Sequence, residues 1–180
     1  MKYKILFLAV LFSAFTFAQD KYYTKSGTII FESSVPAFEE VKATNNKVTA
    51  VLKSDGSIAS LALTKAFRFK IALMEEHFNE NYMESSKFPK ASFSGKISDF
   101  NISDLSSSDK NYKIKGTLTI RGVKKEITIN SKIKLTNNNI HIKADFSVTP
   151  EDFNISIPSI VRKKIAKKVD ISLNFELKKR

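Results

Sequence analysis

Few side chains in this sequence combine the residue types and the spacing that catalysis or metal binding requires. The chain has two histidines, His77 and His141, and no cysteine, which excludes thiolate nucleophiles, disulfides and Cys-ligated metals. Glu76, His77 and Glu80 lie close together, but a zinc site gathers three or four ligands, and only Glu76 and Glu80 would share a helix face. We therefore predict no metal site and interpret this group as a solvated acidic helix face.

Nucleophilic catalysis and phosphate binding find no support in the sequence either. Serines are abundant, but there is no G-x-S-x-G elbow and no glycine-rich phosphate loop, and no serine has a histidine and an acid at a telling spacing. His141 falls on the polar side of an alternating segment, where we expect it to be exposed. The sequence thus predicts a protein that is not an enzyme and needs no cofactor.

Most of the chain alternates apolar and polar residues, which is the pattern of half-buried strands. A sheet with one apolar face must close on itself or be covered, and little helix is predicted to cover it. The sequence therefore predicts an all-β fold, a single antiparallel β-barrel of about eight strands. The strand-like segments are 22–33, 47–53, 57–69, 91–97, 112–121, 127–135, 140–149 and 169–178. In segment 57–69 the residues assigned to the inner face are Ala59, Leu61, Leu63, Phe67 and Phe69.

One segment departs from the strand period. Ile71, Met74, Phe78 and Tyr82 recur at steps of three and four, which predicts a helical insert over about 71–84 that ends before Pro89. Its apolar face would cover the open end of the barrel. A short basic helix is predicted near 160–168.

The N-terminal residues predict export. Lys2 and Lys4 precede an apolar run over 5–17, and Ala18 ends it, which is the pattern of a signal peptide over 1–18 followed by one barrel domain over 19–180. The run is shorter than the about 20 residues that a spanning helix needs. We expect the mature protein to be periplasmic or secreted, as a monomer or a homodimer.

The chain is strongly basic, with 30 Lys and Arg against 18 Asp and Glu, or +12 at pH 7. Since nucleic acid is an unsuitable partner for an exported protein, the charge either favours anionic surfaces or serves solubility. A cluster of basic residues over 162–168 also has two interpretations. It contacts an anionic membrane surface or a lipid headgroup, or it is simply a solvated segment. Its members are Arg162, Lys163, Lys164, Lys167 and Lys168.

The inward apolar residues allow two interpretations of the barrel interior, because any small barrel shows this alternation. They line an apolar tunnel for a lipid, or they fill the barrel completely. In the second case the protein is an interaction protein that uses its basic outer face to bind anionic surfaces or polymers. The residues predicted to line a tunnel are Phe67, Phe69, Met74, Phe78, Tyr82, Phe93, Leu118, Ile120, Phe146 and Phe175.

Three stretches resemble the YceI-like family. They are the insert with its flanking strands over 67–93, the hairpin GTLTIRGVKKE over 116–126, and the late loop DFNI over 152–155. The resemblance covers the mature chain. It implies a lipocalin-like barrel, export, and binding of a long isoprenoid, either a polyprenyl chain or an isoprenoid quinone, by a lipid carrier without catalysis.

Overall fold

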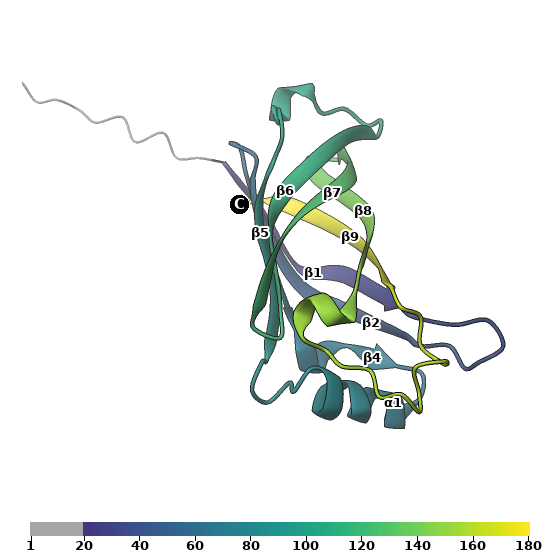
Figure 1. Cartoon of the computed structure of the whole chain (residues 1–180). Coiled ribbons are helices and arrows are strands. Elements are labelled where there is room, and N and C mark those ends of the chain that lie inside the picture. Colours follow the sequence, from purple (N-terminus) through teal and green to yellow (C-terminus); the bar gives the residue numbers. More distant parts are fainter. Residues whose placement is uncertain (1–19) are drawn as a thin grey trace, which may run out of the picture.

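The computed structural model describes residues 20–180, which form one antiparallel sheet that closes into a barrel (Figure 1). The strands follow the order β1-β9-β8-β7-β6-β5-β3-β2, and β2 pairs with β1 to complete the ring. This confirms the predicted all-β, lipocalin-like barrel. The predicted signal peptide over 1–18 lies outside the described residues. The barrel strands are β1 (Lys21–Glu32), β2 (Lys42–Lys53), β3 (Ser57–Leu63), β5 (Lys90–Ile97), β6 (Lys110–Ile120), β7 (Val123–Thr136), β8 (Asn139–Val148) and β9 (Val169–Lys179).

Two tight hairpins set the register of the central strands. The β6–β7 turn holds Arg121 and Gly122 at φ of 48° and 77°, and the β7–β8 turn holds Asn137 and Asn138 at 51° and 61°. Two successive residues of positive φ give the turn twist that matches the twist of the strands. Glycine and asparagine enter this region at low cost, whereas the arginine is held there by side-chain contacts described below.

Strands β6 to β9 alternate as predicted, with apolar residues inward and polar residues outward. The prediction for β3 is wrong, because the buried residues of that strand are Ile58 and Ala62, while Leu63 is 46% exposed. A 3₁₀ turn over Thr64–Ala66 separates β3 from the buried Phe67. This turn shifts the phase, so the alternation of 57–63 and that of 67–69 do not belong to one continuous strand.

The helical insert is confirmed, as α1 (Ala72–His77) followed by a π-helical turn over Phe78–Tyr82. The two-residue strand β4 (Arg68–Phe69), which leads into it, pairs only with β2. No helix within residues 20–180 is long and apolar enough to cross a membrane.

The predicted basic helix near 160–168 is wrong. Residues 159–164 form consecutive turns, in which the Val161 amide donates to the Pro158 carbonyl at 3.1 Å. The backbone of Ala166 is already hydrogen-bonded to Ser33, which follows the neighbouring strand β1. Its amide donates to the Ser33 carbonyl at 2.9 Å, and its carbonyl accepts from the Ser33 hydroxyl at 3.1 Å. An amide that donates to the Ser33 carbonyl cannot also donate the hydrogen bond that a helix would need from Ala166.

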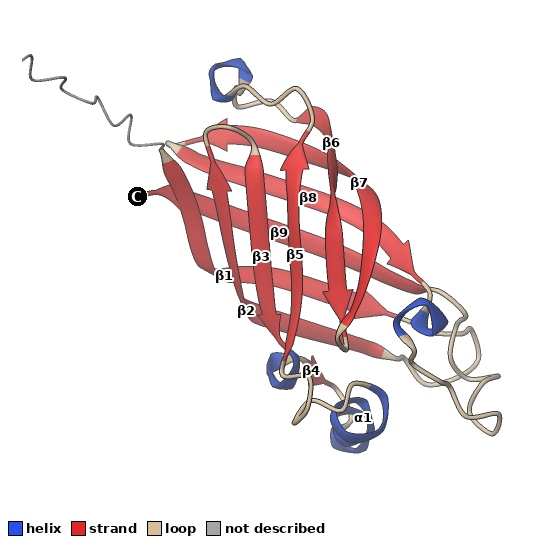
Figure 2. Ribbon diagram, turned by 60° about the vertical axis from the view of Figure 1, so that its left-hand side comes forward, coloured by secondary structure: helices blue, strands red, loops and turns tan. Residues whose placement is uncertain are grey.

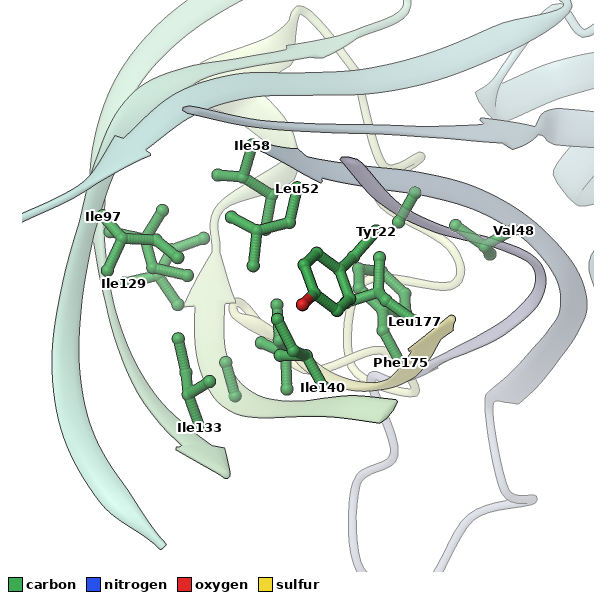
Figure 3. Packing of buried hydrophobic residues seen from close by; sticks show 14 of the residues in the cluster. Tyr22, Val48, Leu52, Ile58, Ile97, Ile129, Ile133, Ile140, Phe175 and Leu177 are labelled. Atoms are coloured by element: carbon green, nitrogen blue, oxygen red, sulfur yellow. The ribbon is translucent and has the colours of Figure 1, made fainter. Parts of the chain in front are cut away.

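The barrel is filled at one end, which we call the closed end. The β2–β3, β5–β6 and β7–β8 connections and the C-terminus lie there (Figures 1 and 2). Leu52, Ile133, Ile140 and Leu177 are fully buried at this end and belong to the same apolar cluster as Tyr22 (Figure 3). The β1–β2 loop, the insert, the β6–β7 turn and the β8–β9 loop lie at the opposite end, which we call the mouth.

An apolar cavity at the barrel mouth

A cavity of about 580 Å³ occupies the mouth half of the barrel. Binding sites for small molecules have volumes of about 300 to 1,000 Å³ and mostly apolar walls. The cavity contradicts the completely filled barrel that the sequence pattern left open. The structure places around it all ten residues predicted to line a tunnel: Phe67, Phe69, Met74, Phe78, Tyr82, Phe93, Leu118, Ile120, Phe146 and Phe175. Their contact with a lipid stays a prediction.

The helical insert lies over the cavity and is fastened by an aromatic cluster. The ring of Phe78 stacks on Phe31 of β1 at a centroid distance of 5.2 Å. It also lies 5.2 Å from Phe69 and 5.8 Å from Phe67. Met74, one turn before Phe78, lines the cavity as well, and methionine repacks easily around different shapes. The insert therefore forms an apolar roof that can adapt to what lies below it.

Arg121 connects the insert to the β8–β9 loop. From the β6–β7 turn its guanidinium pairs with Glu84, at the end of the insert, and donates to the backbone carbonyl of Asn154 in the loop. Lys125 and Asp152 add an ion pair at 3.5 Å between the same hairpin and the same loop. The sequence analysis missed Arg121, for which the only signal is a charged residue beside glycine in a tight turn.

The β8–β9 loop forms one wall of the mouth. It begins with a 3₁₀ turn over Pro150–Phe153, and the buried Phe153 anchors it. Further along, Ile155, Ile157, Val161 and Ile165 face the cavity. Next to this loop, β1 contributes Phe31 to the lining, and the β1–β2 loop contributes Phe38 and Val41. Phe38 was missed because segment 33–40 reads as a polar corner, and only the closed barrel brings it to the mouth.

Polar groups are few and lie mainly at the rim. The cavity lining includes Glu39, His77 and Lys164. Tyr82 is half-buried, and this burial raises the pKa of its phenol above the ordinary value.

The remaining members of the basic cluster do not line the cavity. Arg162 donates to the Ile157 carbonyl at 3.1 Å, and the other three are exposed. They are Lys163, Lys167 and Lys168.

The histidines and acids considered for chemistry do not converge. His77 lines the mouth, whereas His141 lies on β8 opposite Glu176 of β9, on the outer side of the barrel. Glu76 and Glu80 are exposed on the insert. Within residues 20–180 no group of three His, Cys, Asp or Glu side chains could hold a metal ion. What the site offers is apolar volume with a polar rim.

Comparison with known proteins identifies the family. Residues 20–177 match the model of the YceI-like domain. The chain belongs to the YceI-like family. A search of curated proteins finds no match for this sequence.

Several solved structures share the barrel of this YceI-like chain. BcnA of Burkholderia cenocepacia has 14% identity and a TM-score of 0.68, and the match covers 83% of this chain and 95% of BcnA. A polyisoprenoid-binding domain of Saccharophagus degradans, implicated in plant cell wall breakdown, has 12% identity and a TM-score of 0.78, with coverage of 89% and 98%. The YceI protein of Campylobacter jejuni has 18% identity and a TM-score of 0.61, with coverage of 100% and 99%. At these identities the likeness establishes a common fold.

Proposed function

We propose that this YceI-like protein is exported and binds a long isoprenoid, either a polyprenyl chain or an isoprenoid quinone, as a carrier rather than an enzyme. The observation that carries the proposal is the apolar cavity of about 580 Å³ at the barrel mouth. The closed end is packed with fully buried aliphatic side chains. A flexible apolar tail therefore enters from the mouth, and its polar head stays at the rim.

The free energy of binding comes from apolar contact. Each CH₂ group transferred from water contributes about 0.8 kcal/mol, so a branched hydrocarbon tail needs no polar anchor inside the barrel. The cavity extends along β6 from Ile120 at the rim to Ile114. At about 3.3 Å per residue this is about 20 Å of strand, or about 15 Å of depth along the barrel axis because barrel strands tilt by about 35–45°. A long isoprenoid fills such a depth, whereas a short ligand would leave apolar wall uncovered.

The family and its members support this class of ligand. The Saccharophagus degradans domain that shares this fold is a polyisoprenoid-binding domain. The ten lining residues predicted from the sequence include six phenylalanines, whose rings pack against hydrocarbon.

The mouth also suits transient contact with an anionic membrane, from which the ligand would be collected. The segments at the mouth carry exposed apolar side chains, with Phe38 at 47%, Leu73 at 57% and Ile160 at 86% exposure. Ile160 lies beside the basic cluster of residues 162–168. Exposed apolar groups flanked by cations are the pattern of interfacial binding. Lys164 lines the cavity, and we expect its ammonium group to pair with an anionic headgroup such as a pyrophosphate.

Binding to anionic vesicles at rising salt tests the membrane contact. The variant carries Lys163→Gln, Lys164→Gln, Lys167→Gln and Lys168→Gln together, and we expect it to bind more weakly and with less salt dependence than the wild type. Equal binding by the two proteins would refute the contact.

Organic extraction of the natively purified mature protein, followed by mass spectrometry, tests the ligand. We expect a stoichiometric isoprenoid quinone or polyprenol. Ala91 lines the cavity and pairs across β3 and β5 with Ala62, which also lines it, so Ala91→Phe should fill the space and reduce the bound lipid. Ala59→Phe adds the same ring on the exposed face of β3 and serves as the matched control.

Two results would contradict the proposal. One is a wild-type extract without lipid, even after incubation with isoprenoid-containing membranes. The other is an Ala91→Phe protein that stays folded by circular dichroism and retains as much lipid as Ala59→Phe.

A further inference from the structure

The outer face of β5, β6, β7 and β8 carries five lysines that follow one another across the four strands. Two pairs lie directly opposite in the strand register: Lys96 with Lys115, and Lys132 with Lys143. Lys113 joins the pairs, because it lies two residues before Lys115 on β6 and is the diagonal neighbour of Lys132, which follows its direct partner Asn130 by two residues on β7. All five are exposed. We call this row the lysine stripe.

The lysine stripe has no ion-pair partner among residues 20–180. Three carboxylates flank it, and each already accepts hydrogen bonds. Glu126 accepts from the Thr117 hydroxyl, and Asp145 accepts from the Ser172 hydroxyl at 2.5 Å. Asp55, near Lys96, accepts from the Ser57 amide at 2.9 Å.

The neighbouring β8–β9 face is arranged differently. There the outward acids meet polar partners, as Ser147 donates to Asp170 at 2.5 Å and Asn139 donates to Glu176 at 2.7 Å. Directly opposed like charges are destabilising, since the β-carbons of such a pair lie about 5 Å apart. The stripe is therefore an arrangement that works against the stability of the free barrel, and an anionic partner would relieve it.

We propose that the lysine stripe binds a linear polyanion, such as a phosphate- or carboxylate-bearing cell-envelope polymer. Strands lie about 4.8 Å apart, so the stripe extends about 14 Å across the sheet, a length that matches several charges of one chain. The outer surface of a closed barrel is convex, which favours a flexible chain that follows it over a flat bilayer. The stripe thus serves a second interaction, separate from the apolar cavity.

The residues between the lysines fit an anionic polymer better than nucleic acid. The other outward positions of β5 to β7 near the stripe are hydroxyl and amide residues, such as Ser94, Thr117, Thr128 and Asn130. These groups donate hydrogen bonds to phosphate, carboxylate or sugar oxygens. No aromatic side chain stands among them, and sequence-tolerant binding of single-stranded nucleic acid uses aromatic rings as stacking platforms.

The test is fluorescence anisotropy with a labelled long-chain polyphosphate at several salt concentrations. The stripe variant carries Lys96→Gln, Lys115→Gln, Lys132→Gln and Lys143→Gln. The control variant removes the same charge from the opposite wall of the barrel, at exposed positions of β1, β2 and β9 that form no ion pair within residues 20–180. It carries Lys21→Gln, Lys25→Gln, Lys47→Gln and Lys178→Gln.

We expect the stripe variant to bind polyphosphate at least about tenfold more weakly than the wild type. The slope of log K against log salt concentration should become shallower by about 3, since each of the four removed charges contributes about 0.7. The control variant should stay near the wild type. The stripe variant should also unfold at the same or a higher temperature, because two opposed like-charge pairs are gone. Its bound lipid should be unchanged, so a failure of this proposal is distinguishable from a failure of the lipid carrier.

Four results would overturn the proposal. The wild type fails to bind polyphosphate at physiological ionic strength, or the two variants lose affinity equally, which assigns binding to net charge. Single-stranded poly(dT) displaces polyphosphate and binds more tightly, which assigns the stripe to nucleic acid. Anionic vesicles bind through the stripe while polyphosphate does not, which assigns it to the membrane.

Discussion

Replacing Phe78 by alanine should loosen the helical insert while leaving the packed end of the barrel intact. Phe78 belongs to the insert, and its ring contacts Phe31, Phe67 and Phe69 of the barrel side at 5.2, 5.8 and 5.2 Å. Among the five ring pairs that join Phe31, Phe67, Phe69 and Phe78, three involve Phe78. Without this ring, the roof retains mainly Met74 and Tyr82 against the cavity.

The size of the effect follows from these contacts. Truncating a fully buried phenylalanine to alanine costs about 3–5 kcal/mol. Phe78 is only partly buried, so we take about 2 kcal/mol as the total cost, including the loss of its aromatic pairs. At 1.4 kcal/mol for each factor of ten, about 2 kcal/mol increases the equilibrium constant for opening of the insert about 30-fold.

Hydrogen exchange followed by mass spectrometry, on peptides that cover residues 72–82, measures this opening. Phe78→Ala should accelerate exchange there about 30-fold, in proportion to the opening constant. Leu73→Ala is the matched control, because Leu73 lies on the same insert and is 57% exposed. Exchange in Phe78→Ala within about threefold of the wild type, or equal acceleration in Leu73→Ala, would refute the reasoning.

Three further predictions concern the mouth and the barrel wall. Arg121→Gln removes the charged bridge between the insert and the β8–β9 loop and should lower the free energy of unfolding by about 1–3 kcal/mol in urea denaturation; an unchanged midpoint would show that the bridge is not stabilising. Gly27→Ala places a β-carbon 2.6 Å from Cδ1 of Phe175, and we expect a loss of about 1–3 kcal/mol that a second change, Phe175→Leu, partly restores. Burial raises the pKa of Tyr82, so the unfolded chain ionises first as pH rises through about 10, and stability falls until the folded pKa is passed. Tyr82→Phe should remove this part of the alkaline loss in thermal melts, and identical alkaline profiles would contradict the assignment.

The strand pattern was predictable wherever a strand is regular. The inward and outward faces of β6, β8 and β9 follow directly from alternation, because each strand keeps one phase between two turns. The error in β3 has a specific cause. Lys65 interrupts the apolar face, and the 3₁₀ turn at that point reverses the phase, which alternation cannot show.

The start of β2 was missed for a different reason. Segment 42–46 contains Asn45, which reads as a loop residue but is fully buried. Its side-chain amide donates to the Leu63 carbonyl at 3.1 Å and its side-chain oxygen accepts from the Lys47 amide at 2.8 Å. A hydrophobicity pattern cannot identify such a buried polar residue, because one of its two hydrogen-bond partners, the Leu63 carbonyl, comes from another strand.

The composition of the candidate site could be predicted, while its boundaries could not. The ten residues named from the sequence all line the cavity, because they come from inward positions of strands or from the apolar face of the insert. The β1–β2 and β8–β9 loops supply the rest of the mouth. No periodicity marks these loops, and barrel closure alone brings residues such as Phe38 and Val161 to one opening.

By itself, the sequence determined the barrel, the helical insert and the apolar lining, since alternation and helical period are local properties of the chain. Only the tertiary structure decided that the barrel is solid at one end and hollow at the other. That outcome depends on the sizes of the side chains that the eight strands place at the same height along the barrel axis. Large aliphatic residues meet at the closed end, whereas the small Ala62 and Ala91 face each other at the mouth under a roof held by Phe78. The register of the sheet likewise decides that lysines on the outer wall lie opposite one another.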